Sequence, residues 1–231
     1  LGDFWLSLVA AMVACALVGV LVERFLYTPL LHLPRIVPLI GSIGLFIAME
    51  EAFRIVAGPY ALAYDAEIHF PSLAVGPLRL SPPQSLIFTV TLGLLGLLWL
   101  LLSRSKVGLA MRATAMDAET TSTFGVNTRW VVTLNFVIGS ALAGAAGVLI
   151  GVYDNQVWPT MGSIPAYKCL AIVVLGGLGN IPGSVLASFL IGLAETLLIG
   201  VVAIPFPRDA LAFVAMILVL MFRPHGLLGK G

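Results

Sequence analysis

The sequence is poor in charge. Aspartate, glutamate, lysine and arginine make up 10% of its 231 residues, whereas soluble proteins carry about 25%. Because 60% of the residues are hydrophobic, the chain has too few polar side chains to cover a water-facing surface. The composition therefore predicts a protein embedded in a lipid bilayer rather than one or two soluble domains.

Several classes of function lack the residues that they need. The formal net charge is +1 and no basic run is interleaved with aromatics, which argues against nucleic-acid binding. The two cysteines lie in apolar stretches and the three histidines are scattered, so we expect neither a disulfide framework nor a metal site. Neither a phosphate-binding G-x-x-x-x-G-K-[ST] motif nor a nucleophile–base arrangement occurs. We therefore expect no catalytic residue and no cofactor, which disfavours an enzyme and favours transport.

Long apolar runs dominate what is present. A membrane-spanning helix needs about 20 mostly apolar residues. One run, residues 163–181, is weaker because glycine and proline interrupt it at 176–183. Irregular backbone at membrane depth is tolerated only inside protein or beside a wet cavity, so we expect a short or broken helix there. The other candidate spans are residues 4–22, 36–56, 84–102, 130–152, 184–202 and 209–222.

Lysine and arginine predict the orientation, because basic loops tend to stay cytoplasmic. The loop 103–129 holds four basic residues, whereas the loop 57–83 of similar length holds one. With 103–129 inside, seven crossings also place the basic segment 23–35 and the basic tail inside. A re-entrant 163–181 segment would leave that tail outside. The sequence thus predicts an all-α, polytopic transmembrane bundle of about seven crossings, forming a single domain over 1–231.

Two predicted spans carry small residues at every fourth position. Such stripes let helix backbones approach closely in lipid. We interpret them as structural seams between helices, and a substrate path lined by the same residues is the alternative. One stripe is Gly139, Ala143, Gly147 and Gly151, and the other is Ser184, Ser188, Gly192, Thr196 and Gly200.

Four ionisable residues lie well inside the clear apolar spans, where one charge costs about 2.5–3.5 kcal/mol. Glu50 and Arg54 are four positions apart with the acid first, which predicts an intramembrane ion pair toward the outer leaflet. Glu51 lies beside them, and the cluster is either structural or part of a polar cavity. Glu195 lies near the centre of its span without a local partner. It is predicted to be an interhelical anchor or a cavity residue.

The loop 103–129 is the longest internal polar segment. It favours an amphipathic helix in which Arg112 lies off the apolar stripe. Asp117 is predicted to cap a second short turn, and Gly125 is predicted to be a helix stop. Such a helix either lies along the lipid headgroups or docks another protein. Its apolar stripe is Leu109, Ala113 and Met116.

Several short motifs follow one another along the chain. The most distinctive are LGGLGNIPG at 175–183 and RPHGLLG at 223–229. In this order and spacing, the motifs resemble the LivH-type permease subunits of ABC importers for branched-chain amino acids. That family also has an N-terminal portion, so we expect a segment that precedes residue 1. The remaining motifs lie at 23–24, 29–30, 34–40, 108–113 with Asp117, 124–127 and 136–139.

The resemblance implies a heteromeric importer in the bacterial inner membrane. Its expected partners are a second permease chain, two cytoplasmic ATP-binding subunits that use the ATP, and a periplasmic binding protein. The expected cargo is a branched-chain or related amino acid, with other amino acids, urea or short amides as alternatives. From another class, an ion-coupled carrier is the alternative, although a paired carboxylate relay is missing. The residues implied in coupling to the ATPase are Arg112, Ala113, Asp117, Thr121 and Gly125.

The interrupted run at 176–183 gains a possible role from this resemblance. A zwitterionic amino acid needs groups that meet its carboxylate and its ammonium, and the ends of broken helices offer free N–H and C=O groups. The alternative is a tight structural turn. The candidate path residues are Gly176, Gly177, Gly179, Asn180, Pro182 and Glu195.

Overall fold

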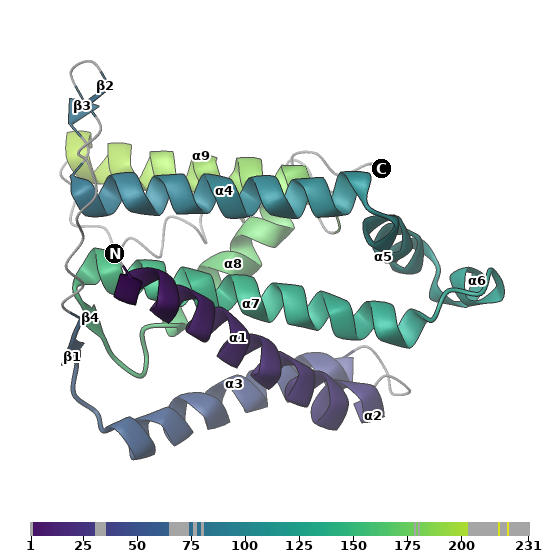
Figure 1. Ribbon diagram of the computed structural model, residues 1–231. Helices are drawn as coiled ribbons and strands as arrows, with labels where there is room; N and C mark the ends of the chain where they lie inside the picture. The colour runs from purple at the N-terminus through teal and green to yellow at the C-terminus, as the bar shows by residue number, and fades with distance from the viewer. Residues whose placement is uncertain are drawn as a thin grey trace. The chain divides into compact units, whose positions relative to one another are not determined.

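The computed structural model describes residues 2–30, 36–64, 74–75, 78–79, 81–177, 179, 181–202, 217 and 221. These residues are almost entirely helical, with a few two-residue strands (Figure 1). They belong to two compact units, residues 1–159 and 160–231. The predicted all-α fold class is confirmed, whereas the count of seven crossings and the single domain stay predictions.

The helices begin and end close to the predicted runs. The run 163–181 breaks, as expected, and the run 209–222 lies outside the described residues except for 217 and 221. Helices of the first unit are α1 (Gly2–Val22), the π-helical turn η1 (Glu23–Tyr27), α2 (Thr28–Leu30), α3 (Ile36–Ala57), α4 (Pro82–Arg104), α5 (Lys106–Met116), α6 (Ala118–Thr123) and α7 (Thr128–Asp154). Helices of the second unit are α8 (Ser163–Gly176) and α9 (Ile181–Val202).

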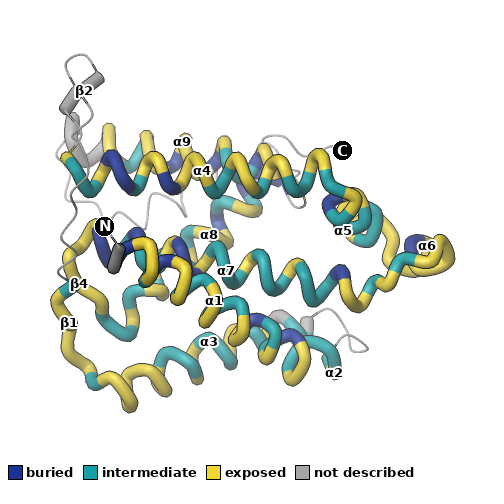
Figure 2. Tube along the Cα trace, viewed as in Figure 1, coloured by how far each residue is buried: buried dark blue, intermediate teal, exposed yellow. Residues whose placement is uncertain are grey.

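Much of the helical surface is exposed (Figure 2), and many of the exposed residues are large and apolar. Leu6 and Leu17 of α1 are 73% and 63% exposed, and Leu97 of α4 is 64% exposed. Side chains of this kind are stable against lipid tails rather than water. Within the described part of the chain, three helical stretches are long and apolar enough to cross a membrane, namely Phe4–Leu30, Pro82–Arg104 and Thr128–Asp154.

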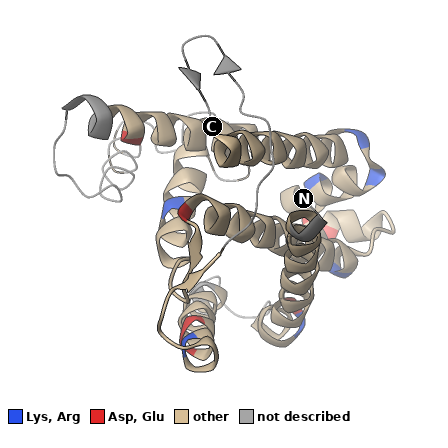
Figure 3. Ribbon diagram, turned by 60° about the vertical axis from the view of Figure 1, so that its left-hand side comes forward, with Lys and Arg blue, Asp and Glu red and all other residues tan. Residues whose placement is uncertain are grey.

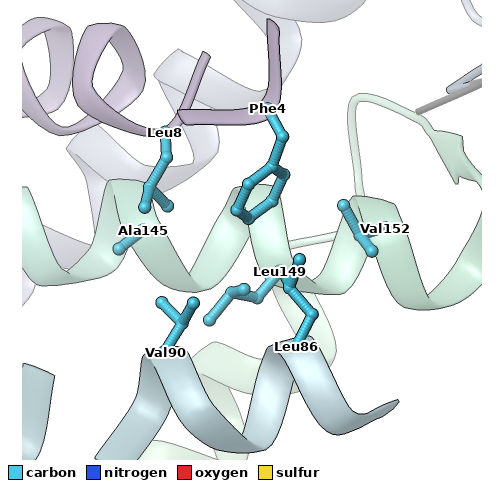
Figure 4. Packing of buried hydrophobic residues seen from close by; sticks show 7 residues of the cluster. All are labelled: Phe4, Leu8, Leu86, Val90, Ala145, Leu149 and Val152. Carbon is cyan, nitrogen blue, oxygen red and sulfur yellow. The ribbon is translucent and has the colours of Figure 1, made fainter. Parts of the chain in front are cut away.

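The core of the first unit lies where α1, α4 and α7 meet (Figure 4). Leu86 of α4 and Ala145 of α7 are fully buried there. Seven buried apolar side chains from the three helices interlock, so these helices hold one another in place. The cluster is Phe4, Leu8, Leu86, Val90, Ala145, Leu149 and Val152.

The backbones of α1 and α7 approach closely at two glycines. A Cβ on Gly144 would lie 2.7 Å from the Ala11 carbonyl oxygen and 3.0 Å from the Cys15 Sγ. Gly19 of α1 faces the Ser140 side chain in the same way.

The seam is therefore offset from the predicted stripe by one position. Among the described residues, a Cβ on Gly139 or Gly147 would meet no atom within 4 Å. One position turns a helical face by about 100°, because the α-helix has 3.6 residues per turn. The contact with α1 therefore uses a neighbouring face of α7, and the role of the predicted stripe as a seam stays a prediction.

The two ends of the first unit differ. One end holds the α4–α5 corner, α6 and η1, and Figure 3 shows basic residues gathered there. At the other end, β1 (Leu62–Ala63) pairs antiparallel with β4 (Gln156–Val157), which joins the loops after α3 and α7. A further hairpin in the loop before α4 pairs β2 (Ala74–Val75) with β3 (Leu78–Arg79).

Candidate functional site

The connection from α4 to α5 is a sharp corner built on one serine. The Ser105 N–H donates to the Leu101 carbonyl at 3.3 Å, which closes α4. The Ser105 Oγ accepts from the Gly108 N–H at 2.9 Å, which caps α5. A Cβ on Gly108 would lie 2.5 Å from the carbonyl oxygens of Leu101 and Leu102. The corner thus requires glycine, and it fixes the direction in which α5 leaves the span.

Asp117 separates α5 from α6. Its Oδ1 accepts from the N–H groups of Glu119 at 3.0 Å and Thr120 at 3.1 Å, and its Oδ2 accepts from the Thr120 hydroxyl. The Thr120 hydroxyl, followed by the Thr120 and Glu119 N–H groups, lowers the pKa of the Asp117 carboxyl, because these bonds favour the charged form. The predicted cap is confirmed.

The connection ends as predicted, at a glycine. Gly125 has φ +82 and its N–H donates to the Ser122 carbonyl at 3.0 Å. A positive φ is easily adopted by glycine, so Gly125 stops α6. Asn127 then caps α7, because its side-chain oxygen accepts from the Trp130 N–H at 3.2 Å.

The predicted coupling residues differ in how accessible they are. Arg112, Asp117 and Gly125 are exposed and Ala113 is half-buried. Thr121 is 7% exposed, and its Oγ1 donates to the Asp117 carbonyl at 2.6 Å. Thr121 therefore supports the connection from within rather than facing a partner directly.

An exposed apolar surface runs along this connection. Met111 of α5 is buried, and it anchors the helix. The outward-facing apolar residues are Leu109, Met116 and Phe124, which are 62%, 90% and 82% exposed. We name these three residues the connection surface. Two of them belong to the predicted apolar stripe, whereas its third member, Ala113, is half-buried.

The break between α8 and α9 is a close crossing of two backbones. Gly177 and Gly179 have φ values of +98 and +84, which are unfavourable for residues with a Cβ. A Cβ on Gly176 would lie 2.5 Å from the Cα of Ser184, so the helix end packs directly on the start of α9. The broken helix is confirmed. Its role in a substrate path stays a prediction, and Asn180 lies outside the described residues.

Glu195 has a partner that sequence reasoning missed. The Lys168 Nζ of α8 lies 3.0 Å from the Glu195 Oε1 and donates a hydrogen bond to Oε2 at 3.1 Å. The Lys168 and Glu195 side chains are 22% and 17% exposed. The sequence predicts that Glu195 has no partner close to it along its own span. The structure shows that its partner lies on the preceding helix instead. The signal that could have indicated this partner is Lys168 itself, a basic residue in the neighbouring run 163–181.

The structure describes contacts of two other acidic residues, Glu51 and Glu23. Arg54 forms an ion pair with Glu51 at 3.3 Å, and both side chains are about half exposed, at 53% and 55%. The pair of Arg54 with Glu50 stays a prediction. Glu23, of the Glu-Arg motif, is 5% exposed in the π-helical turn, where its Oε1 accepts from the Thr28 hydroxyl at 3.0 Å.

Metal chemistry finds no support in the described part of the chain. No group of three or more His, Cys, Asp or Glu residues there is arranged to hold an ion.

The long apolar helices, joined by a capped connection at a basic end, define a polytopic helical membrane protein. The chain belongs to the family described as the permease component of the branched-chain amino acid transport system, whose model matches residues 1–222. It is therefore a multi-pass membrane protein.

Individual relatives agree with this family. The chain is 36% identical to the high-affinity branched-chain amino acid transport system permease protein BraD of Pseudomonas aeruginosa, over 96% of this chain and 73% of BraD. It is 32% identical to the corresponding protein LivH of Escherichia coli K12, over 96% of this chain and 73% of LivH. The autoinducer 2 import system permease protein LsrC of E. coli is 27% identical, over 94% and 64%. No solved structure matches the chain.

Proposed function

We propose that the chain is a permease subunit of an ATP-driven importer in the bacterial inner membrane. It moves branched-chain or related amino acids inward as one half of a permease pair. The family match over residues 1–222 and the relatives BraD and LivH support this proposal. The second permease, identical or similar, supplies the other half of the path.

The observation that carries the proposal is the capped connection between α4 and α7. It holds the basic residues Lys106 and Arg112, directly after Arg104 at the end of α4, and it presents the connection surface outward. Basic loops favour the cytoplasmic side, which supports the proposal that a cytoplasmic ATPase binds this surface. The chain itself needs no cofactor, because the ATP is bound and hydrolysed by that partner. A periplasmic binding protein delivers the amino acid at the opposite side.

Cross-linking tests this docking. Cys15 and Cys169 are first replaced by serine, and single cysteines are then placed at Arg112, Met116 or Thr121 of the complete transporter. Exposed positions 112 and 116 should cross-link to the ATPase in a manner that ATP alters. Cysteine at the buried position 121 is the matched control and should cross-link weakly. If no position cross-links and lipid shields positions 112 and 116, the proposal is contradicted. The connection is then a helix that lies along the lipid headgroups.

Transport in proteoliposomes tests the energy source and the cargo. The reconstituted complex should accumulate leucine when ATP and the binding protein are supplied, and an ionophore should not stop it. An ion-coupled carrier would instead lose uptake with the ionophore. Competition by leucine, isoleucine and valine, compared with urea and short amides, identifies the cargo class. Uptake of urea but not of leucine would contradict the proposed cargo.

A further inference from the structure

Three kinds of contact join α8 to α9. The backbones cross at Gly176 and Ser184. Next come four buried apolar residues, Ala171, Leu175, Ala187 and Ile191. The Lys168–Glu195 ion pair lies farther along both helices, away from the crossing. Apolar packing and close backbone contact already hold the two helices together. The ion pair is therefore not needed to join them.

Stability alone explains this pair poorly. Two charges lose hydration when they leave water, and an apolar pair of similar size is often equally stable or more stable. Charged residues inside membrane spans commonly mark the path of a solute or ion. A pair placed between two apolar helices therefore calls for a functional reason.

The carboxylate of Glu195 can accept further hydrogen bonds. Its Oε2 accepts the hydrogen bond from Lys168, whereas its buried Oε1 lies near the ammonium without accepting a hydrogen bond from any described residue. A carboxylate has about four acceptor positions, and most buried acceptors in proteins are filled. An additional N–H donor would satisfy Oε1. Both side chains keep about a fifth of their surface exposed, at 22% and 17%, so neither is sealed between the two helices.

We propose that Lys168 and Glu195 form a recognition site for the charged backbone groups of the transported amino acid. The ammonium of Lys168 binds the α-carboxylate of the solute, and the carboxylate of Glu195 binds its α-ammonium. One ion pair is replaced by two, and the net charge of site and solute stays zero throughout, which avoids moving an isolated charge through a low-dielectric region. This inference rests on the proposed function, since it assumes that the cargo is a zwitterion.

A neutral pair is the first test. In the complete importer, Lys168→Met is combined with Glu195→Gln, which keeps similar side-chain volumes without charge. Leucine uptake should fall by at least about tenfold, because charged hydrogen bonds to the solute are lost. The ATPase activity stimulated by the binding protein should persist. The matched control is the exposed pair, Glu51→Gln with Arg54→Met, which should leave uptake unchanged.

A charge-swapped pair distinguishes a role in recognising the solute from a role in holding α8 and α9 together. Lys168→Glu with Glu195→Lys keeps the attraction between α8 and α9 but reverses the polarity that the solute meets. Recognition predicts that the swap does not restore leucine uptake, whereas a purely structural pair would be restored to the wild-type rate. Wild-type uptake by either the neutral or the swapped variant overturns the inference.

A measurement on the unmodified complex covers the case in which the variants fail to fold. An amine-reactive reagent is applied with and without saturating leucine, and labelling is measured by mass spectrometry. Leucine should slow the labelling of Lys168 relative to Lys106 on α5, and an unchanged ratio overturns the inference. If the wild-type complex imports no amino acid at all, the proposed function itself fails, which is a distinguishable result.

Discussion

Single side chains at the ends of helices determine the shape of the basic end. Ser105 serves two helices at once, since it closes α4 and caps α5. Asp117 and Asn127 cap the next two helices in turn. Each cap satisfies N–H groups that have no partner within their own helix, so α5, α6 and α7 each start at a defined residue.

The cap at Asp117 should depend on pH. Its pKa in the folded chain is lowered below the ordinary value of 3.8. The carboxylate therefore stabilises α6 fully above that value, and this stabilisation is lost as the pH falls through the lowered pKa. Asp117→Asn should keep α6 capped without this acid sensitivity, whereas Asp117→Ala should uncap it at every pH.

Hydrogen exchange of the Glu119 and Thr120 amides measures this effect. Both amides should exchange faster in the alanine variant than in the wild type at neutral pH, and the asparagine variant should resemble the wild type. Equal protection in all three proteins would show that α6 is held by its other contacts, such as the buried Thr121, instead of by its cap.

Pairs of helices meet through backbone contacts that tolerate little change. The α1–α7 seam depends on Gly19 and Gly144, and the α8–α9 crossing depends on Gly176. At each of these positions a Cβ would press on the backbone or side chain of the facing helix. Close approach of this kind replaces the hydrophobic effect, which does not drive helices together in lipid.

Substitution within α7 tests which face forms the seam. Gly144→Ala should destabilise the chain by about 1–3 kcal/mol, because the new methyl group overpacks against Ala11 and Cys15. Gly139→Ala, on the same helix, should change stability by less than about 0.5 kcal/mol, since open space surrounds it among the described residues. Thermal unfolding in detergent compares the two. A larger loss at position 139 would restore the stripe expected from the sequence.

Across the whole first unit, one end is basic and the other is closed by strands. Tyr60 lies beyond the end of α3, next to β1, and is 79% exposed. Met116 lies at the end of α5 and is 90% exposed. With Cys15 and Cys169 replaced, a membrane-impermeant maleimide should label Tyr60→Cys from outside intact cells and Met116→Cys only after the membrane is permeabilised. Labelling of both from the same side would contradict the predicted orientation.

The features predicted correctly from the sequence are those that depend on residues close together along the chain. The Asp117 cap, the Gly125 stop and the break after Gly176 each depend on residues within a few positions of one another. Contacts between helices were harder to predict. The partner of Glu195 comes from a separate helix. The face of α7 that meets α1 depends on where the facing helix lies, and a spacing of four small residues alone does not specify it.

The seam between α1 and α7 has a consequence for biogenesis. The ribosome completes α1 well before α7, so α1 must first remain in lipid without α7, with the surface beside Gly19 uncovered by Ser140. Helices in membranes commonly insert individually and associate afterwards, and the separation of α1 from α7 along this chain fits that order. A nascent chain that is released before Thr128 would carry α1 without its counterpart. Membrane quality-control proteases would therefore meet an unpaired helix whenever translation stops early.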